Sequence, residues 1–400
     1  MSERFSRVLG RKSLVHVNTY VKGLAAAVLL FIVPLEIILR DALERKEGDW
    51  LVSLQGKITS EHARNFFKAA SLLGNRWVYL GLSPFLIHCV DPLKGLKIVL
   101  VAGFAMYCEG VLGLIYYEPR PGWVRDDIRV QLCDEGFGMP SASLVLFSVL
   151  AVYLLVQYMH KTNYIRVIAY VSIVLISLLL SFAKMYLGVN FPHQVVITLC
   201  YIFVYVTAAL ALDQTLTKLV RTSAFDYQEN KEIAVYWIIT TLFFLLFAIA
   251  IYDIITLNRT LNIKYIKNAN LNCSVSNDLG APNTFEQTAY IFYNLGAVTG
   301  CLQITKFRPR KWWKTALWKR FTRAFLMLGL TIGLFFMLQA IPMDAGTCSY
   351  VFRFAVFNFV CAWTGTAGLS FLGMRVPLFK EADESADVSS RQLVDLSTNP

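Results

Sequence analysis

The sequence predicts an all-α fold, a multi-pass transmembrane helical bundle with nine or ten spans. Hydrophobic residues make up 56% of the 400 residues and charged residues only 16%, whereas a soluble chain carries about 25% charged residues. Apolar stretches long enough to cross a bilayer, which takes about 20 residues, recur along the chain. Lys and Arg also cluster in alternate connecting segments, as they do in membrane proteins of defined orientation. These observations exclude a soluble globular domain.

The hydropathy pattern places the spans in order along the chain. The weakest is the second, which contains Arg76 and Pro84, and the eighth is polar at its start, so nine spans is the alternative count. The ten expected spans are residues 21–39, 70–90, 96–116, 143–159, 165–182, 195–212, 233–256, 287–305, 323–342 and 351–372.

The charge distribution sets the orientation. Basic residues are more frequent in segments on the side of the N-terminus, so this side is expected to be cytoplasmic or its equivalent. The net charge of +11 is therefore a topology signal and implies no nucleic-acid partner. We expect a basic N-terminus at 1–20, a single transmembrane domain at 21–379 and a polar acidic tail at 380–400. The basic segment 306–323, rich in Trp, is typical of a membrane interface and is a candidate docking element.

Three cysteines, Cys133, Cys273 and Cys348, fall in segments on the opposite, non-cytoplasmic side. Either Cys273 pairs with Cys348, which an oxidising compartment permits, or all three are free thiols. Two glycosylation sequons, at Asn258 and Asn272, lie on the same side. These features favour the endoplasmic reticulum or plasma membrane, although the basic N-terminus also fits a mitochondrial inner membrane.

Two non-cytoplasmic loops, residues 116–143 and 183–194, concentrate turn-forming and polar residues. Each ends one helix and begins another, and two spans separate them, so they share one face of the membrane. Helix N-termini with Gly, Ser and basic residues nearby favour anions, because backbone N–H groups and the helix dipole point at the ligand.

These loops resemble the type 2 phosphatidic acid phosphatase superfamily over residues 70–215, and the second loop is most similar to its glucose-6-phosphatase branch. Arg120-Pro121 matches the end of the first family motif and Pro140-Ser141 matches the second. In the third motif, Tyr186-Leu187 and residues 191–196 read like glucose-6-phosphatase. The three matches occur in the family's order and spacing, which chance rarely produces.

The departures from the resemblance fall on the reactive positions. Asn190 stands where the family has its nucleophilic His, and Ser143 where it has the His that acts as general acid. Gly113 replaces a phosphate-binding Lys, and Lys184 replaces an Arg and loses its bidentate fork. Arg120 and Ser141 are retained. His193, beside the nucleophile position in glucose-6-phosphatase, is the one nearby nucleophile.

The sequence therefore predicts a catalytically inactive, phosphatase-like integral membrane protein, kept as a structural, scaffolding or lipid-binding component of a membrane assembly. Its expected partners are membrane lipids, including anionic headgroups, and a membrane protein complex; no cofactor or metal is expected. Arg120, Ser141, Lys184 and His193 are candidate phosphate-binding residues. The alternative is an active lipid-phosphate or sugar-phosphate hydrolase acting through His193. In the equally weighted alternative to phosphate binding, the basic groups pair with acidic residues of the first loop, namely Glu118, Asp126, Asp127, Asp134 or Glu135.

Overall fold

The computed structural model describes residues 19–134, 136–159, 164–224, 231–273, 279–307, 316–339 and 347–372. Within these ranges the chain is helical and forms no strand. The expected N-terminal segment and acidic tail lie outside the described residues, apart from Thr19 and Tyr20, and so do residues 308–315 of the basic segment 306–323. The all-α prediction is confirmed.

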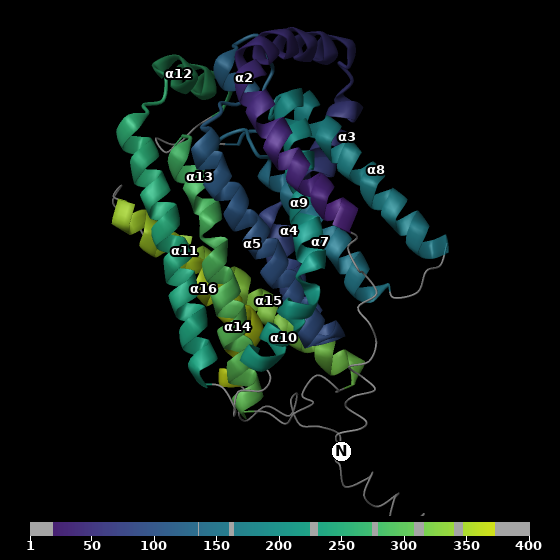
Figure 1. Ribbon diagram of the computed structural model, residues 1–400, viewed down its shortest axis with the longest axis vertical. Helices are drawn as coiled ribbons and strands as arrows, with labels where there is room; N and C mark the ends of the chain where they lie inside the picture. Colours follow the sequence, from purple (N-terminus) through teal and green to yellow (C-terminus); the bar gives the residue numbers. More distant parts are fainter. Residues whose placement is uncertain are drawn as a thin grey trace, which may run out of the picture.

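The helices form one elongated bundle, with α10 near one end and α12 near the other (Figure 1). Two short turns, the 3-10 turn Leu72–Gly74 and the π-helical turn Leu86–Val90, flank α4. The helices are α2 (Thr19–Lys57), α3 (Glu61–Ser71), α4 (Arg76–Phe85), α5 (Pro92–Tyr116), α6 (Pro121–Val124), α7 (Ala142–Tyr158), α8 (Tyr164–Tyr186), α9 (Pro192–Ala211), α10 (Asp213–Ala224), α11 (Lys231–Asn258), α12 (Ile263–Asn272), α13 (Ala281–Thr288), α14 (Tyr290–Phe307), α15 (Leu317–Gln339) and α16 (Thr347–Leu372).

Several helices are long and apolar enough to cross a membrane, which confirms a multi-pass integral membrane protein. Two shorter apolar helices are Ala142–Tyr158 and Phe354–Gly368. The five long candidate spans in the described residues are Thr19–Arg40, Pro92–Val124, Tyr164–Tyr186, Pro192–Ala211 and Val235–Asn258.

Helix α5 is the centre of the bundle. Its span is 72% buried, against 17% for Tyr164–Tyr186 and 11% for Val235–Asn258. Glycines on α5 allow its neighbours to approach closely: a Cβ at Gly103 would lie 2.3 Å from Asn294 Oδ1, and one at Gly110 would lie 2.9 Å from the Thr288 nitrogen. Small residues give membrane helices this close backbone approach. As a result α13 and α14 pack directly on α5.

Three details differ from the sequence expectations. The span expected at 70–90 is interrupted, because Pro84 lies inside α4 and a π-helical turn follows it. Helix α2 runs well past the expected end at residue 39. Its second half packs over the loops, where the Gln55 amide donates to Arg129 O and Tyr186 O, both at 2.9 Å.

The disulfide prediction was wrong. Cys133 pairs with Cys273, with a Cα–Cα distance of 5.9 Å, so it ties the first loop to the end of α12. The Asn268 amide also donates to Trp123 O at 3.0 Å, across the same contact. Neither expected alternative, a Cys273–Cys348 bond or three free thiols, allowed for this bond.

Candidate functional site

Arg120 joins the two motif loops from within. The side chain is 6% exposed and donates to three backbone carbonyls: Gly136 at 2.6 Å, Phe137 at 2.9 Å and Val189 at 3.1 Å. It also pairs with Asp134 at 3.0 Å. Because the guanidinium N–H groups bond to protein atoms, the main role of Arg120 is to hold the two loops together. Of the acidic partners expected, Asp134 is the one it takes; Glu135 lies outside the described residues.

Asn190, at the nucleophile position, is fully buried in a neutral hydrogen-bond network. Its Oδ1 accepts from Ser141 Oγ at 3.2 Å, and its Nδ2 donates to Gly138 O at 2.5 Å. Its Nδ2 also donates to Gln194 Oε1 at 3.4 Å. A Cβ at Gly138 would lie only 2.6 Å from Gln194 Oε1, so glycine is required there.

Gln194 extends this network to the first loop. Its Oε1 accepts the Phe191 N–H at 3.0 Å and its Nε2 donates to Pro119 O at 2.9 Å. The amides of Asn190 and Gln194 are thus held by backbone groups of both loops. Asn190, which the sequence predicts to stand at the family's nucleophile position, thus has both polar atoms of its side chain bonded to protein.

A cavity of about 410 Å³ lies beside this network. Ala142 and Ser143 of the first turn of α7 line it, and their backbone N–H groups have no intrahelical acceptor. Arg76, which also lines the cavity, pairs with Glu286 of α13. Arg120, Ser141, Asn190 and His193 do not line the cavity. Its polar lining residues are Ser71, Asn75, Arg76, Asp134, Ser143, Lys184, Asn283, Glu286 and Gln287.

Lys184 is the unpaired cation of this cavity. It is 5% exposed, and among the described residues its ammonium has neither a hydrogen bond nor an ion pair within 4.0 Å. Two charged groups act on the Lys184 ammonium from beyond ion-pair distance: Asp134 attracts it and Arg120 repels it. A buried ammonium without a partner is costly unless an anion accompanies it. The α7 N-terminus and Lys184 together form a cup for an anion.

At Gly113, helix α13 occupies the space that a lysine would need. A Cβ there would lie 2.7 Å from Thr284 Cγ2. Thr284 is itself fixed, because its Oγ1 accepts the Phe137 N–H at 2.8 Å and donates to Gly280 O at 2.9 Å. The docking of α13 on α5 therefore leaves no room for a side chain at Gly113, the position that the sequence predicts to correspond to the family's lysine.

His193 points away from the cavity, toward α2. Its Nδ1 lies 2.5 Å from Glu47 Oε2, and its Nε2 contacts Glu118 Oε1. Its backbone N–H also donates to Glu47, at 3.1 Å. Both ring nitrogens are engaged by carboxylates, so the ring is not placed for attack on a group held by Lys184.

Arg40 completes a buried charge cluster around His193. It lies 3.0 Å from Glu36 and 4.0 Å from Glu118, which is fully buried. Glu36, Glu118 and His193 have ligand atoms close enough to share a metal ion, but Arg40 already supplies the positive charge among these carboxylates. Sequence reasoning missed this cluster. The spacing of Glu36, Arg40 and Glu47 along one helix was the available signal.

One family model and one solved structure are similar to parts of this chain. Residues 94–218 match the family model described as the PAP2 superfamily. Among solved structures, the chain is similar to the first transmembrane PAP2-type phosphatidylglycerolphosphate phosphatase from Bacillus subtilis, with 18% identity and a TM-score of 0.40 over 48% of this chain and 96% of that one. No curated protein matches the sequence.

The protein is thus a multi-pass helical membrane protein. More particularly, its segment 94–218, which holds every motif position considered above, is PAP2-like. The likeness to glucose-6-phosphatase remains a prediction from the sequence.

Proposed function

We propose that this protein is a non-catalytic PAP2-like membrane protein that holds the phosphate group of a ligand on its non-cytoplasmic face without cleaving it. The proposal rests on one observation. The buried Lys184, which has no partner among the described residues, and the first turn of α7 line the same cavity. Such a site offers a full positive charge and backbone donors to an oxyanion. The family's reactive groups are replaced beside it.

The chemistry of the replaced positions supports binding over hydrolysis. An amide at Asn190 has no nucleophilic lone pair of the required strength, and its atoms are hydrogen-bonded to Gly138 and Ser141. Loss of a nucleophile costs about 10⁶ in rate, and loss of a general acid at Ser143 costs about 10²–10⁴ more if the effects are independent. What remains is electrostatic attraction to the ligand.

The alternative, hydrolysis through His193, needs that ring to reach a phosphate in the cavity. His193 lies outside the cavity lining and is held between Glu47 and Glu118. We therefore rank it below binding alone. Its direct test is phosphate release from phosphatidic acid and glucose 6-phosphate by the purified full chain: release that His193→Ala abolishes would establish the alternative.

The binding test uses the full chain in lipid nanodiscs, titrated with inorganic phosphate and with short-chain phosphatidic acid while thermal unfolding is followed. We expect both probes to raise the unfolding temperature of the wild type. In Lys184→Met the apparent affinity should fall by about tenfold or more, the usual consequence of losing a charge-assisted contact. Lys218→Met, at an exposed position of α10, is the matched control and should bind normally.

The two probes separate two sources of the phosphate group. A response to phosphatidic acid alone would assign the cup to a lipid headgroup, and a response to both would assign it to phosphate in general. If neither probe shifts the wild type, or if Lys184→Met responds like the wild type, the proposal fails.

The substitution Asn190→His tests the proposal that the protein does not hydrolyse phosphate esters. We expect no phosphate release, because Ser143 still occupies the position of the general acid. Release restored by this single substitution would show that the site needs only its nucleophile, and would contradict our account.

As a non-catalytic protein it would act through its surfaces, as a subunit or lipid-binding component of a membrane assembly. Purification in mild detergent should then recover partners in fixed ratio. A monodisperse chain without partners would count against this part of the proposal.

A further inference from the structure

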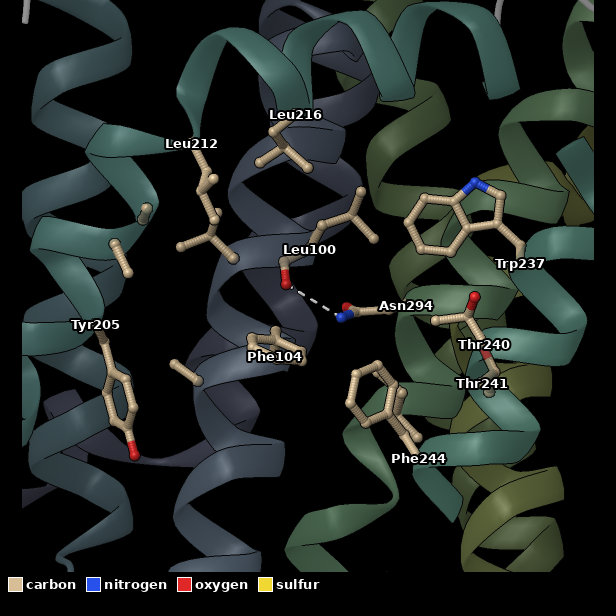
Figure 2. A pocket seen from close by; sticks show the side chains of 15 residues that line it. Leu100, Phe104, Tyr205, Leu212, Leu216, Trp237, Thr240, Thr241, Phe244 and Asn294 are labelled. Atoms are coloured by element: carbon tan, nitrogen blue, oxygen red, sulfur yellow. Dashed lines mark hydrogen bonds between the residues drawn. The ribbon is translucent and has the colours of Figure 1, made fainter. Parts of the chain in front are cut away.

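A second cavity, of about 250 Å³, lies against residues 100–105 of α5, whereas the cavity of the phosphate cup meets the same helix at Met106. It is enclosed by α5, α9, α10, α11 and α14, and its aromatic walls include Phe104, Trp237 and Phe244 (Figure 2). Leu212 and Leu216 close it at the α10 end (Figure 2). No charged side chain lines it.

The position of this cavity indicates what surrounds it. Helices α5, α9 and α11 are each candidate membrane spans, so an opening between them faces the hydrocarbon of the bilayer. Ala208 of α9, which lines the cavity, is itself exposed. Helices α9 and α11 have their main packing elsewhere, α9 on α2 and α7 and α11 on α5 and α14, which leaves the lateral entrance between them.

The size and shape suit a hydrocarbon chain. Apolar cavities of about 150 Å³ already bind a benzene-sized molecule and stay dry. From Leu212 to Tyr205 the cavity follows about two turns of α9, or about 10 Å. An elongated apolar space open to lipid takes a chain rather than a compact solute.

Three buried polar atoms of the lining residues lack a protein partner. They are the Trp237 indole nitrogen, the Tyr205 hydroxyl and Asn294 Oδ1. Asn294 is 3% exposed, and its Nδ2 donates to Leu100 O at 3.1 Å, which fixes the cavity wall (Figure 2). Buried polar atoms normally have partners. These three atoms are covered by surrounding protein atoms, so they offer an occupant no hydrogen bond and the accessible wall of the cavity is apolar.

We propose that this cavity binds one acyl chain of a bilayer glycerolipid, entering from the leaflet on the α10 side. The chain lies along α5 between Phe104 and Phe244. Trp237 lies near the start of α11, at the depth where tryptophans meet the lipid interface. This site is independent of the phosphate cup and survives if the cup fails its test.

The test is photo-crosslinking of the full chain in vesicles of phosphatidylcholine that contain a fraction bearing a diazirine on one acyl chain. We expect adducts to concentrate on the cavity-lining parts of α5, α9 and α11, above the level on the lipid-facing helix α8. Ala208→Phe fills the cavity and should lower the adducts there by about tenfold, the factor expected when about two methylenes are excluded.

Ala211→Phe, one turn further along α9 and outside the cavity lining, is the matched control and should leave the adduct pattern unchanged. Equal labelling of α8 and the cavity residues, or an Ala208→Phe protein labelled like the wild type, would overturn the proposal. A free diazirine fatty acid that labels as well as the phospholipid would assign the site to the free acid and overturn our choice of occupant.

Discussion

Two lysines at opposite ends of the bundle are equally buried, yet their surroundings differ. Lys97 is 4% and Lys184 is 5% exposed. Lys97 lies 2.6 Å from Asp213 and donates to Thr217 at 2.8 Å. Lys184 has no such partner among the described residues and faces a cavity. A buried charge that is paired with protein atoms contributes to the fold, whereas a buried charge without a protein partner is available to bind a ligand.

The cluster at Lys97 shows how completely this chain can satisfy a buried charge. Asp213 also accepts from Tyr153 at 2.7 Å and from Gln157 at 2.8 Å. The cluster therefore joins α5, α7 and α10 at the end of the bundle that the charge distribution predicts to be cytoplasmic. The contrast with Lys184 predicts opposite effects on stability when each charge is removed.

The largest effect is expected for Lys97→Met. It leaves Asp213, whose side chain is 24% exposed, without its counter-ion, and should lower the free energy of unfolding by about 2–3 kcal/mol. Thermal unfolding in detergent measures it, with exposed Lys218→Met as the control. Adding Asp213→Asn should recover part of the loss, because it removes the charge left alone. A loss as small as that of Lys218→Met would remove the basis of the comparison.

Gly113→Ala tests the structural cost at the other end. The added Cβ meets Thr284 Cγ2, and overpacking of this kind costs about 1–3 kcal/mol, against a gain of up to about 1 kcal/mol in helix propensity. We expect a net destabilisation, measured by thermal unfolding.

Thr284→Ser provides the matched rescue, because it deletes the methyl group but keeps the Oγ1 that accepts the Phe137 N–H. In that background Gly113→Ala should be neutral or stabilising. If the alanine destabilises both backgrounds equally, α13 is not what excludes a larger residue at this position.

Lys184→Met should raise the free energy of unfolding by about 1 kcal/mol when phosphate is absent, since it removes an uncompensated buried charge. The same variant should gain nothing from added phosphate. Thermal unfolding with and without phosphate gives both values. A destabilised Lys184→Met protein would mean that a protein group already pairs with this lysine.

The sequence predicted which residues lie near the site, but few of the contacts that these residues make. The sequence predicted that the two motif loops share one face of the membrane, and in the structure Ser141 of the first loop donates to Asn190 of the second at 3.2 Å. Asp134, the partner of Arg120, was one of five acidic residues expected as alternatives to phosphate. The pairing of His193 with Glu47 was not foreseen, because Glu47 lies on the half of α2 that was expected to be loop.

The fold was predictable in class because apolar length and period are local properties of the sequence. Which helices pack together is not local. The docking of α13 against Gly113, and the bond between Cys133 and Cys273, depend on contacts between segments more than 100 residues apart. Sequence spacing alone could not choose Cys133 over Cys348 as the partner of Cys273.

The smallest predicted effect is a pH dependence at the Lys97 end. Burial alone would raise the pKa of Asp213, but hydrogen bonds from Lys97 and Tyr153 outweigh it and hold the pKa below its ordinary value. A lowered carboxyl pKa contributes stability above the ordinary value of about 3.9, and this contribution is lost as the pH falls through the lowered pKa. We therefore expect the difference in unfolding temperature between the wild type and Asp213→Asn to be constant near neutrality and to shrink below about pH 4. A difference that grows on acidification would mean that the fold stabilises Asp213 in its protonated form. The interpretation of Lys97 and Asp213 as a stabilising ion pair would then be wrong.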